Sequence, residues 1–594
     1  MIVFKNIRVR PEKATNDRPH DAEVRCTVLT TTDGAKLRSV RADLSEFGGP
    51  IEQAMTLDGR ERLSSTMEGE YSAKFRINEL ADTGTYEIPL FALDTEGTSG
   101  RRTARLPVEY RRPSGLPRFT DDNGFSALAR AAGARVSAVS RVEILWDGDA
   151  AFKRRLLLIE NAKRQINIQV YLLVPNGRIR EITNALMKKA EEGVEVNLLV
   201  NTDTQLPSSP FAGLRFKVHR VLLDLESLSK TLESKIAAKE DVSGEELLDL
   251  VKKLGTGKRG VNLVMFSRQS LQSLGDRRPS ENEHAVWVRN LVGTGEVEKA
   301  VVSTLSEWAS PFRGAGGLPS LPLLDYAIHD KLMVVDGERA IIGGRNLDER
   351  YFSPWVDLDL YLEGPVVHDI QAGIVRSLKE FSRSGTTTLP TRLPRPAVSP
   401  PFFCQSRPWD RENAPLHLLV RAMQMARERL FISSQYVVLP PGLLRDALLD
   451  AAERGVDVRL LTNSHRTGSE IGLATGFLIS LNYFSDLLTA GARIFEFRGT
   501  DNPEEEQPYY HAKEFLVDGR VAIVGSFNLS ARSCYVESES LIAIDDAALT
   551  GDLERAFLSR LDARADEITR AKFTAYWDEH RTAAQLAKRA EILY

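Results

Sequence analysis

The sequence predicts a multidomain protein in which an all-β N-terminal sandwich precedes two α/β halves packed as a pseudo-twofold dimer around one shared site. Three observations lead to this fold class. The first 113 residues alternate like short strands, the rest alternates helical and strand patterns, and one spaced set of polar residues occurs twice. At 594 residues the chain is also too long for a single core.

Residues 1–113 contain alternating runs such as "AEVRCTVLT", "GEYSAKFRI" and "GTYEIPLFAL", separated by turn residues. This pattern is typical of a small β-sandwich. The stretch "TMEGEYSAKFRINELADTGTYEIPLFALDTEG" is similar to immunoglobulin-like modules of bacterial surface and secreted proteins. That resemblance implies a spacer or a docking module for a membrane, a protein or an envelope partner. The stretch "RRPSGLPRFTDDNG" (111–124) has turn-forming composition, and residues 114–145 are expected to be a linker.

The remaining chain divides into a first half at 146–395 and a second half at 396–594. "NALMKKAEEGVEVNLLVN" (184–201) is echoed by "DALLDAAERGVDVRLLTN" (446–463), each an amphipathic helix that ends at a glycine before a buried strand. The first half is longer, and its charged segment at about 222–256 is expected to form a solvated helical insertion. The second half should end in helices.

One constellation of polar residues occurs in both halves. His329, Lys331 and Asp336 have HxKxxxxD spacing, and His511, Lys513 and Asp518 repeat it. An asparagine follows each histidine by 17 positions and an acid follows each by 28; these are Asn346 and Asp357 in the first half and Asn528 and Glu539 in the second. Five repeated positions are not expected by chance, so both sets should contribute to one site.

The duplicated motif, with a trailing GGxN or GSxN, resembles the phospholipase D superfamily, and its flanking residues are most similar to the bacterial cardiolipin synthase branch. The resemblance covers about Trp146 to Asp545 and implies two halves with one active site between them. Gly343 and Gly525 occupy the structural glycine position. Gly344 departs from the Ser or Thr that many members carry, whereas Ser526 keeps the hydroxyl.

These residue types suit metal-independent cleavage of a phosphodiester. Two lysines and two asparagines can stabilise the charge on phosphorus, and Ser526 is expected to add a hydrogen bond to phosphate. One histidine attacks phosphorus to form a phosphohistidine while the other moves protons. Asp357 and Glu539 are the candidates to hold the far nitrogen of each imidazole. The symmetric spacing leaves the assignment of the nucleophile open, and the resemblance favours His329.

Asp336 and Asp518 stand at Asp-Gly turns, where an aspartate caps its own backbone, so both are expected to be structural. No further cluster of carboxylates, histidines or cysteines has metal-ligand spacing. The sequence therefore predicts neither a metal nor another cofactor.

The favoured function is a phospholipase D or a phosphatidyltransferase acting on phospholipid at a membrane surface. A nuclease on the same fold is the alternative, weakened by a net charge of -4 and by the lack of a basic tail. A binding module with a relic site is the third, opposed by the intact motifs. No signal peptide or run of about 18 apolar residues is present, so a cytoplasmic or peripheral membrane location is expected.

Overall fold

The computed structural model describes residues 1–57, 67–174, 177–201, 262–266, 327–381, 400–410, 412–467, 471–500 and 508–588. The helical insertion expected at about 222–256 lies outside these residues. The described chain forms two compact units. One contains Met1–Leu116 and Leu439–Asp450, and the other contains the rest.

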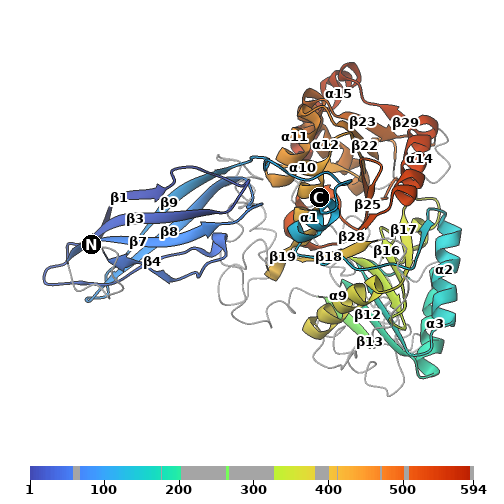
Figure 1. The fold of residues 1–594 in the computed structure, drawn as a ribbon, viewed down its shortest axis with the longest axis horizontal. Coiled ribbons are helices and arrows are strands. Elements are labelled where there is room, and N and C mark those ends of the chain that lie inside the picture. The colour runs from blue at the N-terminus through green and yellow to red at the C-terminus, as the bar shows by residue number, and fades with distance from the viewer. Residues whose placement is uncertain are drawn as a thin grey trace, which may run out of the picture. The chain divides into compact units, whose positions relative to one another are not determined.

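The N-terminal region is all-β, as predicted (Figure 1). One sheet has the order β1 (Ile2–Arg10), β3 (His20–Thr30), β7 (Glu68–Ile77), β6 (Thr56–Leu57). The other has the order β2 (Ala14–Thr15), β9 (Ser99–Glu109), β8 (Gly84–Asp94), β4 (Leu37–Ala42), β5 (Gln53–Ala54). Alternate residues of both sheets, such as Val24 and Ile88, are buried in one common core that contains only residues of this region.

The segment expected to be a linker carries regular structure that belongs to the second unit. Helix α1 (Gly124–Ala131) lies within it, and β10 (Arg141–Leu145) pairs antiparallel with β17 (Asp359–Glu363). A five-residue strand with a partly exposed pattern gives a weak sequence signal, because its pairing partner is more than 200 positions away. The second compact unit therefore begins before Trp146.

The first half is built on a seven-stranded sheet. Its order is β10, β17, β16 (Arg339–Gly343), β15 (Lys331–Val335), β11 (Gln165–Val170), β12 (Glu195–Asn201), β13 (Asn262–Phe266). Figure 1 shows α2 (Gly148–Glu160) and α3 (Ile179–Glu191) on one side of this sheet and α9 (Val366–Phe381) on the other. Buried residues of α2, α3 and one sheet face, including Ile159, Ile182 and Ile168, share a core.

The second half is built on a nine-stranded sheet. Its order is β19 (Glu412–Asn413), β18 (Pro401–Arg407), β28 (Ser540–Asp545), β25 (Val521–Gly525), β24 (Glu514–Val517), β20 (Arg429–Ser433), β22 (Asp457–Asn463), β23 (Arg493–Phe497), β29 (Ala565–Glu567). Its main helices are α10 (Ala414–Met425), α12 (Ile471–Ala490), α14 (Ala547–Arg564) and α15 (Arg570–Lys588). Most of α11 (Leu443–Glu453), which lies between them in sequence, is assigned to the other compact unit.

Six consecutive strands repeat between the two sheets. The order β17, β16, β15, β11, β12, β13 corresponds to β28, β25, β24, β20, β22, β23, with three antiparallel pairings followed by two parallel ones in each. The two halves therefore share the same strand topology as well as the same motif.

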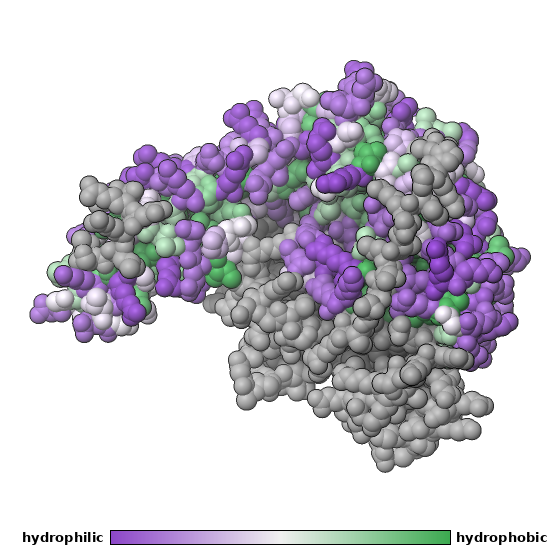
Figure 2. Space-filling model, turned by 60° about the horizontal axis from the view of Figure 1, so that its bottom comes forward, coloured by the Kyte–Doolittle hydropathy of each residue, from purple (hydrophilic) through white to green (hydrophobic). Residues whose placement is uncertain are grey.

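The surface drawn in Figure 2 is mainly hydrophilic over the described residues, with hydrophobic side chains interspersed. Among these residues no helix is long and apolar enough to cross a bilayer.

Candidate active site

Each motif aspartate organises a turn and the strand beside it. Asp336 and Gly337 both have positive φ (56° and 69°), as do Asp518 and Gly519 (50° and 64°), the combination that a type I′ hairpin turn requires. Each carboxylate accepts three successive backbone N–H groups at the start of the adjacent strand, from residues 163–165 in the first half and 427–429 in the second. The carboxylates thus hold a neighbouring strand, rather than capping their own turn as expected.

The two histidines lie just ahead of the central strands. His329 stands between β14 (Ala327–Ile328) and β15, and His511 precedes β24. The Nζ atom of Lys331 donates to the carbonyl oxygen of His329 at 2.5 Å, and Lys513 makes the same contact with His511. All four side chains are buried. The HxK spacing thus folds each lysine back beside its own histidine.

Backbone hydrogen bonds join the two motifs. Strand β14 pairs in parallel with β27 (Glu537–Ser538), and the His329 N–H donates to the Ser538 carbonyl at 2.9 Å. The equivalent bond joins the His511 N–H to the Val356 carbonyl at 2.8 Å. Each histidine is therefore placed against the segment that carries the other half's acid.

The histidine–acid pairs cross between the halves. Nδ1 of His329 lies 3.0 Å from Oε1 of Glu539, and Nδ1 of His511 lies 2.7 Å from Oδ2 of Asp357. An imidazole that donates from Nδ1 to a carboxylate presents Nε2 with a free lone pair. The structure thus brings together the four residues that the repeated spacing singled out, and it adds the exchange of partners, which the spacing did not specify.

Two asparagines that were not assigned a role fix the residue before each histidine. The side chain of Asn201 donates to the Ile328 carbonyl at 2.6 Å and accepts from its N–H at 3.0 Å. Asn463 makes the same two contacts with Tyr510, both at 2.8 Å. Their signal was present in the sequence, because both end the repeated "NLLVN" and "RLLTN" stretches.

The proposed phosphate-binding side chains are buried. Burial lowers the pKa of Lys331 to about 8 and that of Lys513 to about 7. Asn346 accepts from the Leu172 N–H at 3.2 Å through Oδ1. Within the described residues, neither polar atom of the Asn528 side chain has a hydrogen-bond partner. An unpaired buried amide is costly unless a ligand completes it.

The Gly-Gly and Gly-Ser pairs pack directly on the acids. A β-carbon at Gly343 or Gly525 would collide with the adjacent strand. A β-carbon at Gly344 would collide with Oδ1 of Asp357, whereas the Ser526 hydroxyl donates to Oε2 of Glu539. The serine hydroxyl therefore supports Glu539 in this structure, and its expected hydrogen bond to phosphate stays a prediction.

Burial pulls all four members of the histidine–acid pairs toward their neutral forms. Burial, followed by the charges of the two lysines, holds the pKa of His329 and His511 well below the usual value. Burial raises the pKa of Asp357, with Lys513 opposing it, and burial together with Glu537 raises that of Glu539. Neutral imidazoles at this site are competent nucleophiles or bases.

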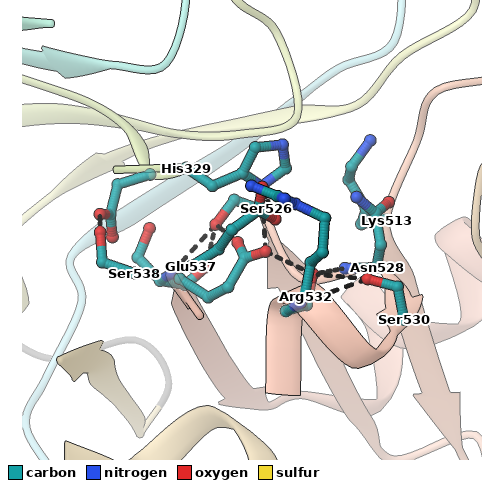
Figure 3. Close-up of polar contacts among 12 residues, drawn as sticks. His329, Lys513, Ser526, Asn528, Ser530, Arg532, Glu537 and Ser538 are labelled. Carbon is teal, nitrogen blue, oxygen red and sulfur yellow. Dashed lines mark hydrogen bonds and ion pairs between the residues drawn. The ribbon is translucent and has the colours of Figure 1, made fainter. Parts of the chain in front are cut away.

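The surroundings of the two histidines differ. Tyr351 and Trp355 lie against His511, with ring centroids 4.9 Å and 5.9 Å away. The ring centroids of His329 and Tyr171 lie 5.1 Å apart, and Glu537, which pairs with Arg532, lies near His329 (Figure 3). These neighbours lie outside the repeated spacing and were missed from sequence.

His329, Glu537 and Glu539 include residue types that bind metals, and their candidate ligand atoms lie within 4.8 Å of one another. However, Nδ1 of His329 is already bonded to Glu539, and Nε of Arg532 donates to Glu537 at 2.8 Å. The guanidinium supplies the positive charge that a cation would bring. The fit to a metal is therefore poor, and metal independence stays a prediction.

Curated relatives cover only part of this chain. Cardiolipin synthase A of Citrobacter koseri is 33% identical over 293 residues, which cover 44% of this chain and 56% of that protein. Cardiolipin synthase A of Cronobacter sakazakii is 33% identical over 263 residues, covering 41% and 50%. The chain thus spans about half the length of the curated relatives it matches.

Among solved structures, the phosphatidylserine synthase of Haemophilus influenzae matches with a TM-score of 0.48 and 11% identity, covering 80% of this chain and 100% of that one. A likeness at this level carries no argument about function. The family comparison is more direct. Residues 156–378 and 419–561, which include both histidines, match the family described as "Cardiolipin synthase, PLD-like domain". Because that match spans more than half of the chain, this protein belongs to the phospholipase D-like family.

Proposed function

We propose that this protein is a phospholipase D-type enzyme that transfers or hydrolyses the phosphatidyl group of a phospholipid through a phosphohistidine intermediate. The observation that carries the proposal is the reciprocal pairing of His329 with Glu539 and of His511 with Asp357. Two oriented imidazoles beside two buried lysines supply the nucleophile, the proton carrier and the charge stabilisation that a phosphodiester requires.

In the proposed first step, Nε2 of neutral His329 attacks phosphorus. A nitrogen–phosphorus bond forms while the bond from phosphorus to the leaving alcohol breaks. His511, which takes up a proton when the negative phosphodiester binds beside it, gives that proton to the alcohol. In the second step, His511 takes a proton from the incoming alcohol or water, whose oxygen displaces His329 from phosphorus. Lys331, Lys513 and Asn528 hold the non-bridging oxygens throughout.

The architecture we propose for this chemistry is a pseudo-twofold arrangement of the two halves. The repeated strand order and the matched backbone bonds from His329 and His511 support it. We also propose that the N-terminal region is an immunoglobulin-like sandwich that docks the enzyme to its substrate surface, a membrane, or to a protein or envelope partner. Its two sheets around a separate core support that role.

Phospholipid is the substrate class we favour, with an alcohol such as the headgroup of phosphatidylglycerol as acceptor. The cardiolipin synthase A relatives support this choice over nucleic acid. The net charge of -4 gives no general attraction to a polyanion. A relic site is disfavoured, because both histidines, their lysines and their paired acids are all present and in contact.

The test is to incubate the purified full chain with phosphatidylglycerol vesicles and, separately, with single-stranded DNA. We expect a new phospholipid or phosphatidic acid from the vesicles, and no DNA cleavage. His329→Ala and His511→Ala should each abolish turnover, because the two histidines act as one unit. His580→Ala, on α15, is the matched control. DNA cleavage, or near-normal vesicle activity in either single variant, would refute the proposal.

A further inference from the structure

The arginine that follows each motif asparagine by four positions has a different partner in each half. In the first half, Nη2 of Arg350 lies 3.0 Å from Oδ2 of Asp348, and its guanidinium lies over the Trp355 ring at 5.1 Å from the centroid. The carboxylate and the arginine both belong to the turn after Asn346. This arrangement keeps the charge pair within one short segment.

In the second half the position of Asp348 is occupied by Ser530. Its hydroxyl donates to Ser533 at 3.3 Å and cannot neutralise an arginine. Arg532 pairs instead with Glu537, at 2.8 Å, and Glu537 occupies the position that Trp355 has in the first half. The carboxylate partner of the arginine has therefore moved seven positions along the chain.

That shift brings the carboxylate to a histidine. Oε2 of Glu537 lies 3.9 Å from Nδ1 of His329, while Glu539 lies 3.0 Å from the same atom, and the side chains of both acids are at most 5% exposed. His511 has a tryptophan ring in place of this second acid. Among the described residues, two carboxylates lie within 4.0 Å of Nδ1 of His329, whereas Asp357 alone lies within that distance of Nδ1 of His511.

Several other charged or titratable groups act on His329 or lie around it, and all of them belong to the site described above. They are Lys331 of β15, Lys513 before β24, His511, Arg532 of α13 (Ala531–Tyr535), Asp330 and Tyr171. The lysines and the arginine all disfavour a positive imidazole. A second buried acid opposes them.

We propose that Glu537, held by Arg532, is a positioning residue that acts through His329 and favours the positively charged imidazole that forms when this histidine bonds phosphorus or carries a proton. This inference deepens the proposed function. The effect expected on kcat rests on that function, whereas the effect expected on the His329 titration does not. The electrostatic effect on His329 has the same sign whether that histidine is the nucleophile or the proton carrier.

The first test is Glu537→Gln, which keeps the size and a hydrogen-bond acceptor for Arg532. By NMR titration of the ¹⁵N-labelled imidazoles of the full chain, the His329 midpoint should move to lower pH by about one unit. With phosphatidylglycerol vesicles, kcat should fall about tenfold, and the limb of the pH profile that belongs to His329 should move the same way. The matched control, Asp348→Asn, removes an arginine partner in the first half and should leave the His329 titration unchanged.

The second test is the double variant Ser530→Asp/Glu537→Gln, which restores to Arg532 the partner that Arg350 has. We expect this variant to recover thermal stability while keeping the shifted titration and the lower kcat. Recovery of the wild-type titration and kcat would mean that Glu537 serves only Arg532, and it would overturn the proposal. An unshifted titration in the single variant, or failure of both variants to fold, would overturn it as well. The titration needs no phospholipid, so an inactive wild-type enzyme would refute the proposed function alone.

Discussion

Nδ1 of His511 lies 2.7 Å from Oδ2 of Asp357, a residue 154 positions earlier in the chain, in the other half. The counterpart is the contact between His329 and Glu539, 210 positions apart. Because each histidine depends on an acid from the opposite half, neither half holds a complete histidine–acid pair. We therefore expect the duplicated motif to function only when both halves are packed together.

Exchanging the acids for amides should therefore affect the histidine of the other half. Asp357→Asn should change the imidazole ¹⁵N signals of His511 and leave those of His329 in place, and Glu539→Gln should do the reverse. An amide no longer fixes the tautomer, so each variant should lose about 10³-fold in kcat. Signals that move only in the acid's own half would contradict the crossed pairing.

Gly344 should tolerate no side chain. A serine there, matching Ser526 in the second half, would place its β-carbon against Oδ1 of Asp357. Gly344→Ser should destabilise the unit by about 1–3 kcal/mol and, by displacing the acid from His511, lower kcat about 100-fold.

The reciprocal change provides the control for Gly344. Ser526→Gly removes the hydroxyl that donates to Glu539 but creates no clash. Loss of one hydrogen bond to a charged group should lower kcat only about tenfold. Thermal unfolding and vesicle assays measure both effects. Equal losses of kcat in the two variants would contradict this explanation. They would mean that glycine beside Asp357 and serine beside Glu539 are not matched to those acids.

The repeated spacing alone predicted the histidines and acids that meet at the site. Residues that recur at the same spacing in both halves are expected to contribute to one shared site. The spacing did not predict which acid serves which histidine, since that depends on β14 pairing with β27 across the halves. The hydrogen bond from the Ser526 hydroxyl to phosphate stays a prediction, and the structure adds a contact of this hydroxyl with Glu539 that the sequence did not indicate. Glu537 was missed because its position holds a tryptophan in the first half, and repeat comparison selects only what is shared.

The fold was predictable where periodicity was strong. The all-β region and the repeated helix and strand patterns have long runs of buried, regularly spaced residues. Strand β10 was assigned to a linker because its burial pattern is irregular and its pairing with β17 is entirely non-local.

The motif aspartates should matter for stability more than for chemistry. Asp336→Asn and Asp518→Asn each weaken three hydrogen bonds from backbone N–H groups to a carboxylate, so each should cost about 1–3 kcal/mol of unfolding free energy. Asparagine tolerates positive φ, which keeps the turn. The control is Asp552→Asn on an exposed face of α14, where the expected change is about 0–1 kcal/mol. Normal stability with a large loss of kcat in the folded protein would instead place these aspartates in the chemistry.

Turnover should survive treatment with EDTA followed by dialysis. The charge on phosphorus is assigned to Lys331 and Lys513, and Arg532 already provides the positive charge beside Glu537. Activity on phosphatidylglycerol vesicles should stay within about twofold of the untreated enzyme. Metal content measured on the same sample makes the result interpretable. Loss of activity that Zn²⁺ or Mg²⁺ restores would show that the cluster of His329, Glu537 and Glu539 binds an ion.

Anion binding at the site should weaken as pH rises from 6 to 9. The pKa of Lys513 is about 7 and that of Lys331 about 8, so both ammonium groups are charged at pH 6 and lose protons across this interval. Burial holds the pKa of both histidines well below the usual value, so they titrate at lower pH than the two lysines. An anion that keeps a constant charge, such as sulfate, isolates the lysines.

By calorimetry, the affinity for sulfate should fall at least tenfold between pH 6 and pH 9. Bound sulfate favours the charged lysines, so binding should take up protons in the upper part of the range. Lys513→Arg should flatten the profile, because a guanidinium stays charged throughout. Lys189→Arg, at a partly exposed pair with Glu192 near the end of α3, should follow the wild-type curve. A sulfate affinity that does not change with pH in the wild type would show that the buried lysines keep their charge up to pH 9. Groups of the protein, rather than the bound anion, would then stabilise the two ammonium groups.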